Sequence, residues 1–126
     1  MITENSKLLT EFETFTIDPA GFGHREHIEV AYEMLQKYGF LDASAKYSKA
    51  ISTIATNAGA PKKFNVTITM AFLSLIAERI YSTEQNSFEE FLSKNEDLLS
   101  RSVLNKWYSK EQLDSEFART HFLLPS

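Results

Sequence analysis

Two histidines stand three residues apart in the stretch GFGHREHIEVAYEML, which covers residues 21–35. Residues at this spacing are neighbours on a helix, so the rings of His24 and His27 can face the same space. Two imidazoles placed in this way can bind a metal ion, share a proton with a carboxylate, or bind an anion when charged. Because histidine titrates near neutral pH without tuning, we predict His24 and His27 as candidate catalytic acid–base residues.

Two other interpretations of this pair remain open. In a structural role, His24 begins the helix and bonds to free backbone groups, while a neighbour satisfies the His27 ring at the edge of the core. A metal site requires at least one more ligand, and the third histidine of the chain, His121, lies near its C-terminus. The sequence has no cysteine and no E-x-x-H motif, so a third ligand would be a carboxylate such as Glu78. We predict no metal and no cofactor.

A second candidate feature is a stripe of small and polar side chains on the apolar run VTITMAFLSLIAERIY, residues 66–81. The stripe follows helical spacing and holds Thr67, Ala71, Ser74 and Glu78. Small residues can leave room for a ligand that the hydroxyl groups and the carboxylate orient. The other interpretation is close helix packing, with Glu78 at the surface beside a basic residue.

The segment KKFN, residues 62–65, directly precedes this run. Asn65 is predicted to cap the helix. A lysine at a helix N-terminus adds to the positive end of the dipole, which suits an anion site made by Lys62 or Lys63 with free backbone N–H groups. An ordinary solvated loop explains the same residues.

These features would form one site if the beginnings of the two helices meet. His24 and His27 would then face the segment that begins the second helix. The two helix beginnings would line the polar opening, or mouth, of a pocket whose deeper part is aromatic. The residues at this mouth would be Lys63, Asn65 and Thr67, with walls formed by Phe22, Tyr32, Phe64 and Phe72.

Periodicity predicts an all-α fold of five to seven helices in one domain, residues 1–126, with a mostly buried central helix at about 66–81. An N-terminal helix and loop occupy 1–20, and the tail 120–126 is expected to pack on the body. We also expect helices over 4–13, 24–38 and 43–57, with Gly39 as a left-handed stop and Asp42 as a cap. Ser87 caps a shorter helix, and a capping box of Ser109 and Gln112 opens a last helix through about Arg119.

Charge and composition narrow the classes of partner. The net charge is −4 and basic residues are scattered, which disfavours nucleic acid as a partner. The first residues do not resemble a signal peptide, and the apolar run is too short to span a bilayer. We therefore predict a cytoplasmic protein with no membrane partner. A small-molecule ligand and a homodimer are both left open.

The sequence resembles a family of small uncharacterised bacterial helical proteins over about residues 20–125. The segments that carry the resemblance are FGHREHIEVAYEML, GAPKKFNVTITMAFLSLIAERI, FEEFLSKNEDLL and YSKEQLDSEFARTHFLLP. The pattern of this family runs F-x-H-R-x-H-h-x-x-A, then K-(Y/F)-H-x-T-(I/L)-T, then Y-(S/T)-x-x-x-L and a final F-x-x-P, and the chain follows it except at one position. The resemblance implies a helical fold and a motif, but no reaction.

Carried over from this resemblance, the motif residues of the chain are His24, Arg25, His27, Lys63, Thr67 and Thr69. The chain departs at Asn65, where the family often has histidine. Asparagine can donate and accept hydrogen bonds but cannot act as a base. This departure disfavours a metal and leaves hydrogen-bond recognition of a small molecule intact.

Two hypotheses about function follow. In the first, a polar pocket binds a small polar or anionic molecule, with acid–base chemistry from His24 or His27. The predicted ligand-binding residues are Arg25, Lys63, Asn65, Thr67, Thr69 and Glu78. In the second, the protein is a non-catalytic interaction or dimerisation module whose docking surface is the helix SFEEFLSKNEDLL or the tail EFARTHFLLPS, provided that exposed aromatic side chains form a patch there.

Overall fold

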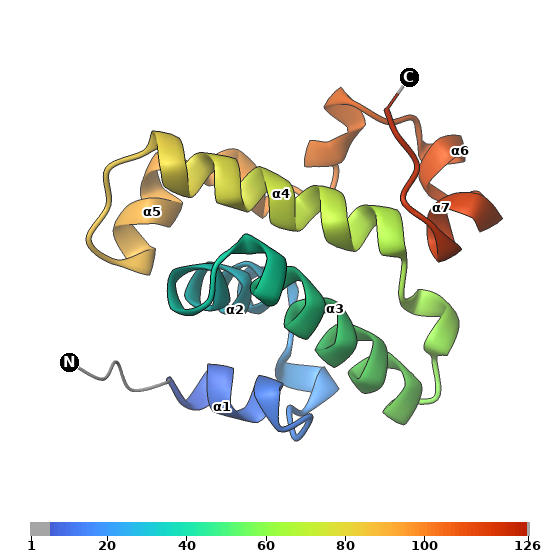
Figure 1. The fold of residues 1–126 in the computed structure, drawn as a ribbon, viewed down its shortest axis with the longest axis horizontal. Helices are drawn as coiled ribbons and strands as arrows, with labels where there is room; N and C mark the ends of the chain where they lie inside the picture. The colour runs from blue at the N-terminus through green and yellow to red at the C-terminus, as the bar shows by residue number, and fades with distance from the viewer. Residues whose placement is uncertain (1–5, 126) are drawn as a thin grey trace. The chain divides into compact units, whose positions relative to one another are not determined.

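Residues 6–125, the part of the chain that the computed structural model describes, contain seven α-helices, four short 3-10 helices and no strand (Figure 1). The predicted all-α class is confirmed. The chain divides into two units, residues 1–61 and 62–126. The expectation of a single domain stays a prediction.

The first unit consists of three helices that pack against one another, α1 (Lys7–Glu13), α2 (His24–Lys37) and α3 (Phe40–Asn57), with a short turn η1 (Pro19–Gly21). Its core includes the fully buried ring of Phe12. This ring lies 5.5 Å from the ring centroids of both Phe22 and Tyr47, so it joins the loop before α2 to α3. The predicted helix over 4–13 corresponds to α1; its first two residues lie outside the described part.

The junction between α2 and α3 differs from the prediction. Gly39 is not a left-handed stop: its φ of −64° and ψ of 173° make it the extended residue before α3. The helix therefore begins at Phe40, and Asp42 lies inside its first turn instead of capping it. A carboxylate in the first turn still interacts favourably with the positive end of the helix dipole, so the residue type fits either position. The left-handed glycine is Gly59, with φ of 77°, after α3 ends.

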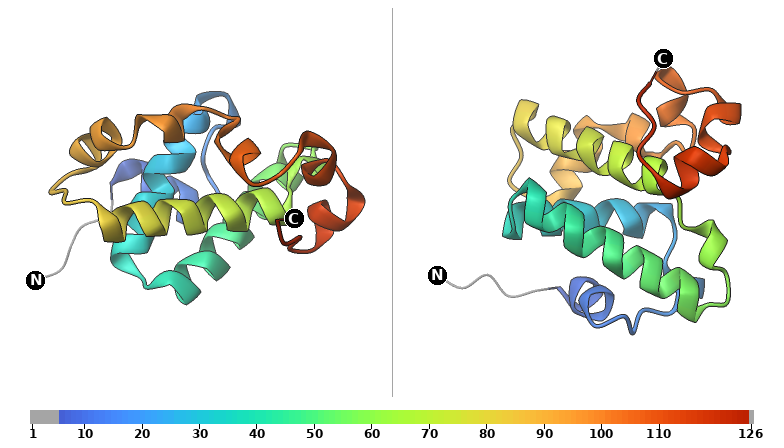
Figure 2. Two further views of the ribbon diagram at one scale, coloured as in Figure 1. Left: turned by 90° about the horizontal axis from the view of Figure 1, so that it is seen from above. Right: turned by 45° about the vertical axis from the view of Figure 1, so that its right-hand side comes forward.

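The second unit is built on α4 (Val66–Ser82), which confirms the helix predicted over 66–81. The remaining helices of this unit are α5 (Phe88–Lys94), η3 (Glu96–Leu99), η4 (Val103–Lys106), α6 (Lys110–Leu113) and α7 (Glu116–Thr120), and η2 (Pro61–Lys63) lies at its beginning. Both η4 and α7 pack on α4. Figure 2 shows the C-terminal segment, residues 121–124, which follows α7, beside the first turn of α4. None of the helices in residues 6–125 is both long and apolar enough to cross a membrane.

The last predicted helix is two helices. The capping box is present as predicted, with Ser109 accepting from the backbone N–H of Gln112 and Gln112 accepting from Ser109. However, α6 ends at Leu113, and Ser115 caps α7 by accepting from the N–H of Ala118. A serine hydroxyl competes for backbone donors, and here it starts a second helix where continuation was expected.

Candidate functional site

The first predicted group of site residues lies in the first turn of α2. His27 is half-buried, and its Nδ1 lies 2.8 Å from the carbonyl oxygen of Gly23. The His27 ring also packs on the ring of Phe22, with centroids 4.1 Å apart. A backbone carbonyl and an aromatic ring therefore fix the orientation of this imidazole.

The contact with Gly23 also determines which nitrogen of His27 carries the proton. A carbonyl oxygen can only accept, so Nδ1 must donate, and Nε2 carries the lone pair when the ring is neutral. A fixed tautomer of this kind allows a histidine to act as a base or a hydrogen-bond acceptor at Nε2. The same carbonyl also accepts the backbone N–H of His27 at 3.0 Å, so the ring is tied to the beginning of helix α2.

The charged neighbours of His27 make local contacts along α2. Glu26 accepts from the N–H of Gly23 at 2.8 Å and so closes the beginning of the helix. Arg25 lies 3.2 Å from Glu29 one turn later, and both side chains are partly exposed. His24 is half-buried at the first position of the helix. The first two turns of α2 therefore carry two imidazoles, a guanidinium and two carboxylates.

The second predicted group lies at the beginning of α4, where Asn65 makes two side-chain hydrogen bonds. Its Oδ1 accepts from the backbone N–H of Ile68 at 2.9 Å, which confirms the predicted cap. Its Nδ2 donates to the carbonyl oxygen of Leu113 at 2.8 Å. Asn65 therefore joins the beginning of α4 to the end of α6.

Thr67 is buried and makes two hydrogen bonds with the C-terminal segment. Its hydroxyl donates to the carbonyl oxygen of His121 at 2.7 Å and accepts from the N–H of Leu123 at 2.9 Å. Tyr108, which is also buried, donates its hydroxyl to the carbonyl oxygen of Leu123 at 2.7 Å. We call Thr67 and Tyr108 together the hydroxyl clasp. Both side chains bind backbone groups of their own chain.

The other predicted residues of this unit lie away from the contacts that Asn65 and Thr67 make. Lys63 is exposed in η2, and Thr69 is buried on α4. Glu78 is exposed and lies about three turns beyond Thr67 on the same helix, about 16 Å along its axis. The structure thus brings together Asn65 and Thr67, while Glu78 belongs to the other half of α4.

The convergence of the two groups stays a prediction, because His24, Arg25 and His27 belong to the first unit and the others to the second. Within residues 6–125, no three histidine, aspartate or glutamate side chains gather in an arrangement that could hold a metal ion. We therefore propose no metal site.

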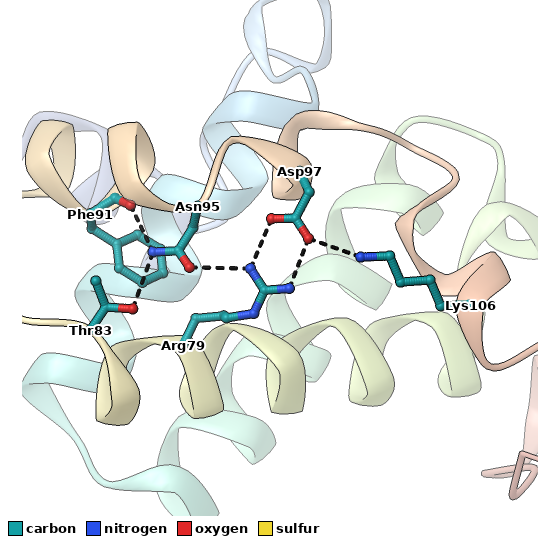
Figure 3. A network of polar contacts seen from close by, with 6 residues as sticks. All are labelled: Arg79, Thr83, Phe91, Asn95, Asp97 and Lys106. Carbon is teal, nitrogen blue, oxygen red and sulfur yellow. Dashed lines mark hydrogen bonds and ion pairs between the residues drawn. The ribbon is translucent and has the colours of Figure 1, made fainter.

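Sequence reasoning missed a polar network at the other end of α4 (Figure 3). The guanidinium of Arg79 donates two parallel hydrogen bonds of 2.8 Å to Asp97 and a third, of 3.1 Å, to the side-chain oxygen of Asn95. Lys106 donates to the same carboxylate at 3.2 Å, and the buried Asn95 donates to the carbonyl oxygen of Phe91. The hydrogen bonds from Arg79, supported by Lys106, hold the pKa of Asp97 well below its usual range.

This network holds α4, α5, η3 and η4 together, and it has no sequence signal because its partners lie far apart in the sequence and on different elements. Both oxygens of the Asp97 carboxylate accept from Arg79, and one of them also accepts from Lys106. Its chemistry is therefore that of a structural ion pair.

Exposed apolar side chains form a second feature of this unit. They include Trp107, which is 44% exposed, and three residues near the C-terminus that are 53%, 45% and 72% exposed, namely Phe117, Phe122 and Leu124. The Phe117 ring stacks on His121 at 4.7 Å. We call Phe117, Phe122 and Leu124 the C-terminal apolar residues.

No protein-family model, curated protein sequence or solved structure matches this chain. The resemblance to a family of bacterial helical proteins therefore stays a prediction.

Proposed function

We propose that this protein is a non-catalytic interaction module that binds another polypeptide through its C-terminal apolar residues. The observation that carries the proposal is the exposure of Phe122 and Leu124 on a segment whose backbone is held by buried side chains. An apolar side chain in water gains free energy when a partner covers it. Because the hydroxyl clasp already orders the segment, binding would incur little further loss of conformational entropy.

Two of the polar residues predicted for a ligand pocket, Asn65 and Thr67, support the same proposal. Asn65 and Thr67 are occupied with backbone groups of their own unit, so their hydrogen-bonding capacity serves the fold. A ligand would have to displace these bonds to reach them. Docking through the exposed segment leaves them intact.

Selection of a random peptide library on phage, with the full chain immobilised, tests this proposal. We expect enriched peptides to bind the Phe122→Ser/Leu124→Ser variant about 10-fold or more weakly, because truncating two central apolar contacts removes well over 1 kcal/mol. Leu41→Ser is the matched control, since Leu41 is 83% exposed on the first unit. Peptides that bind the double variant as tightly as the wild type would contradict the proposal.

A second candidate, binding of a small polar molecule beside His27, is favoured by the fixed tautomer of that ring. His27→Ala removes the hydrogen bond to Gly23 and the contact with the Phe22 ring, among other contacts, and is expected to lower the free energy of unfolding by about 1 kcal/mol, so the variant stays folded. A thermal-shift screen of metabolites should then give a response in the wild type that His27→Ala loses and the control His121→Ala keeps. Identical responses in all three proteins would eliminate this candidate.

A further inference from the structure

Within residues 6–125, the backbone of the C-terminal segment, residues 121–124, is hydrogen-bonded along one edge only. The Thr67 hydroxyl bonds the carbonyl of His121 and the N–H of Leu123, and the Tyr108 hydroxyl bonds the carbonyl of Leu123. In an extended chain these groups all point to the same side, because backbone groups alternate direction with each residue. The dihedral angles of His121, φ −138° and ψ 175°, are those of an extended residue.

The backbone groups of Phe122 and Leu124 form the opposite edge of this segment. Their backbone N–H and carbonyl groups have no hydrogen-bond partner among residues 6–125. Pro125 follows, and a proline disfavours the helical region for the residue before it, which favours an extended conformation at Leu124. The side chains of Phe122 and Leu124 also share one face, since side chains alternate with a period of two.

These groups define the partner by its chemistry. A docking helix has already used its own N–H and carbonyl groups, so it could cover the two side chains but could not bond this edge. An extended peptide offers backbone donors and acceptors at matching spacing and apolar side chains on the same face. We propose that the partner's binding segment is extended and pairs as a strand with residues 122–124.

This inference rests on the proposed function and concerns how the same residues bind. The experiment uses the peptides enriched on the full chain and methylates their backbone nitrogens one position at a time. In a paired strand only alternate N–H groups face the neighbouring strand. We expect methylation to weaken binding about 10-fold at alternate positions and less than about 3-fold at the positions between them.

Two variants of the protein test the contribution of its own residue 124 to the pairing. Leu124→Pro removes the N–H and keeps apolar bulk, whereas Leu124→Ala keeps the N–H and removes bulk. Strand pairing predicts the larger loss of peptide affinity for Leu124→Pro, with the amide of Leu123 still protected from hydrogen exchange in both variants. That protection shows that the hydroxyl clasp is intact.

The outcomes separate the two proposals. Peptides that lose affinity for Phe122→Ser/Leu124→Ser but show no two-residue period under methylation would overturn strand pairing and leave the interaction module standing. Peptides that bind Phe122→Ser/Leu124→Ser as tightly as the wild type would overturn both proposals. A two-residue period together with a larger effect of Leu124→Pro supports both.

Discussion

Thr67→Val is expected to lower the free energy of unfolding by about 2 kcal/mol, because two hydrogen bonds of a buried hydroxyl are lost at once. Valine has nearly the same shape and is also branched at Cβ, so helix α4 itself should form unchanged. The carbonyl of His121 and the N–H of Leu123 would face a methyl group and stay unpaired. Urea denaturation followed by circular dichroism measures the loss.

Hydrogen exchange at Leu123 gives a local reading of the same change, since this amide donates to the Thr67 hydroxyl. We expect its exchange to accelerate in Thr67→Val and to stay slow in the wild type. Thr53→Val is the matched control: Thr53 donates to the carbonyl of Lys49 within α3, and its loss should cost less than about 0.5 kcal/mol. Equal effects of the two valine variants would show that the clasp does not hold the segment.

The positions of the helices were predictable because their signals are local. Apolar spacing located α2 and α4, and the capping residues Asn65 and Ser87 were correctly assigned because each bonds a donor three residues ahead. The boundary between α2 and α3 was wrong, because Gly39 and Asp42 are both acceptable around a helix beginning. Local preference cannot choose between two starting points three residues apart.

The role of Thr67 was not predictable for a different reason. A threonine on an apolar helix indicates that its hydroxyl must find a partner. The sequence does not say whether the partner is a ligand or a backbone group more than fifty residues away, as it is here. Thr67 and Tyr108, which lie far apart in the sequence, both bond the C-terminal segment.

The ion pair of Arg79 and Asp97 shows the same limit, because 18 residues, which include helix α5, separate the two in the sequence. Arg79→Met is expected to lower the free energy of unfolding by about 2 kcal/mol at pH 7. The variant leaves the side-chain oxygen of the buried Asn95 without its donor and leaves Asp97 with Lys106 alone. The side chains of Arg79 and Asp97 are 25% and 37% exposed, so solvent screening keeps the loss below that of a fully buried pair.

The pH dependence of stability distinguishes the contribution of the charge of Asp97 from that of its packing and hydrogen bonds. Because the folded state lowers the pKa of Asp97, its stabilising contribution is complete above the pKa of the unfolded chain, about 4, and declines as the pH falls below that value. The difference in unfolding free energy between the wild type and Asp97→Asn should therefore shrink by about 1 kcal/mol or less between pH 6 and pH 3. Asp42→Asn, at an exposed pair with Lys46 on α3, should differ from the wild type by less than about 0.5 kcal/mol at pH 6. If the difference for Asp97→Asn were constant across this range, Asp97 would stabilise the second unit by its shape and hydrogen bonds, and its charge would contribute nothing.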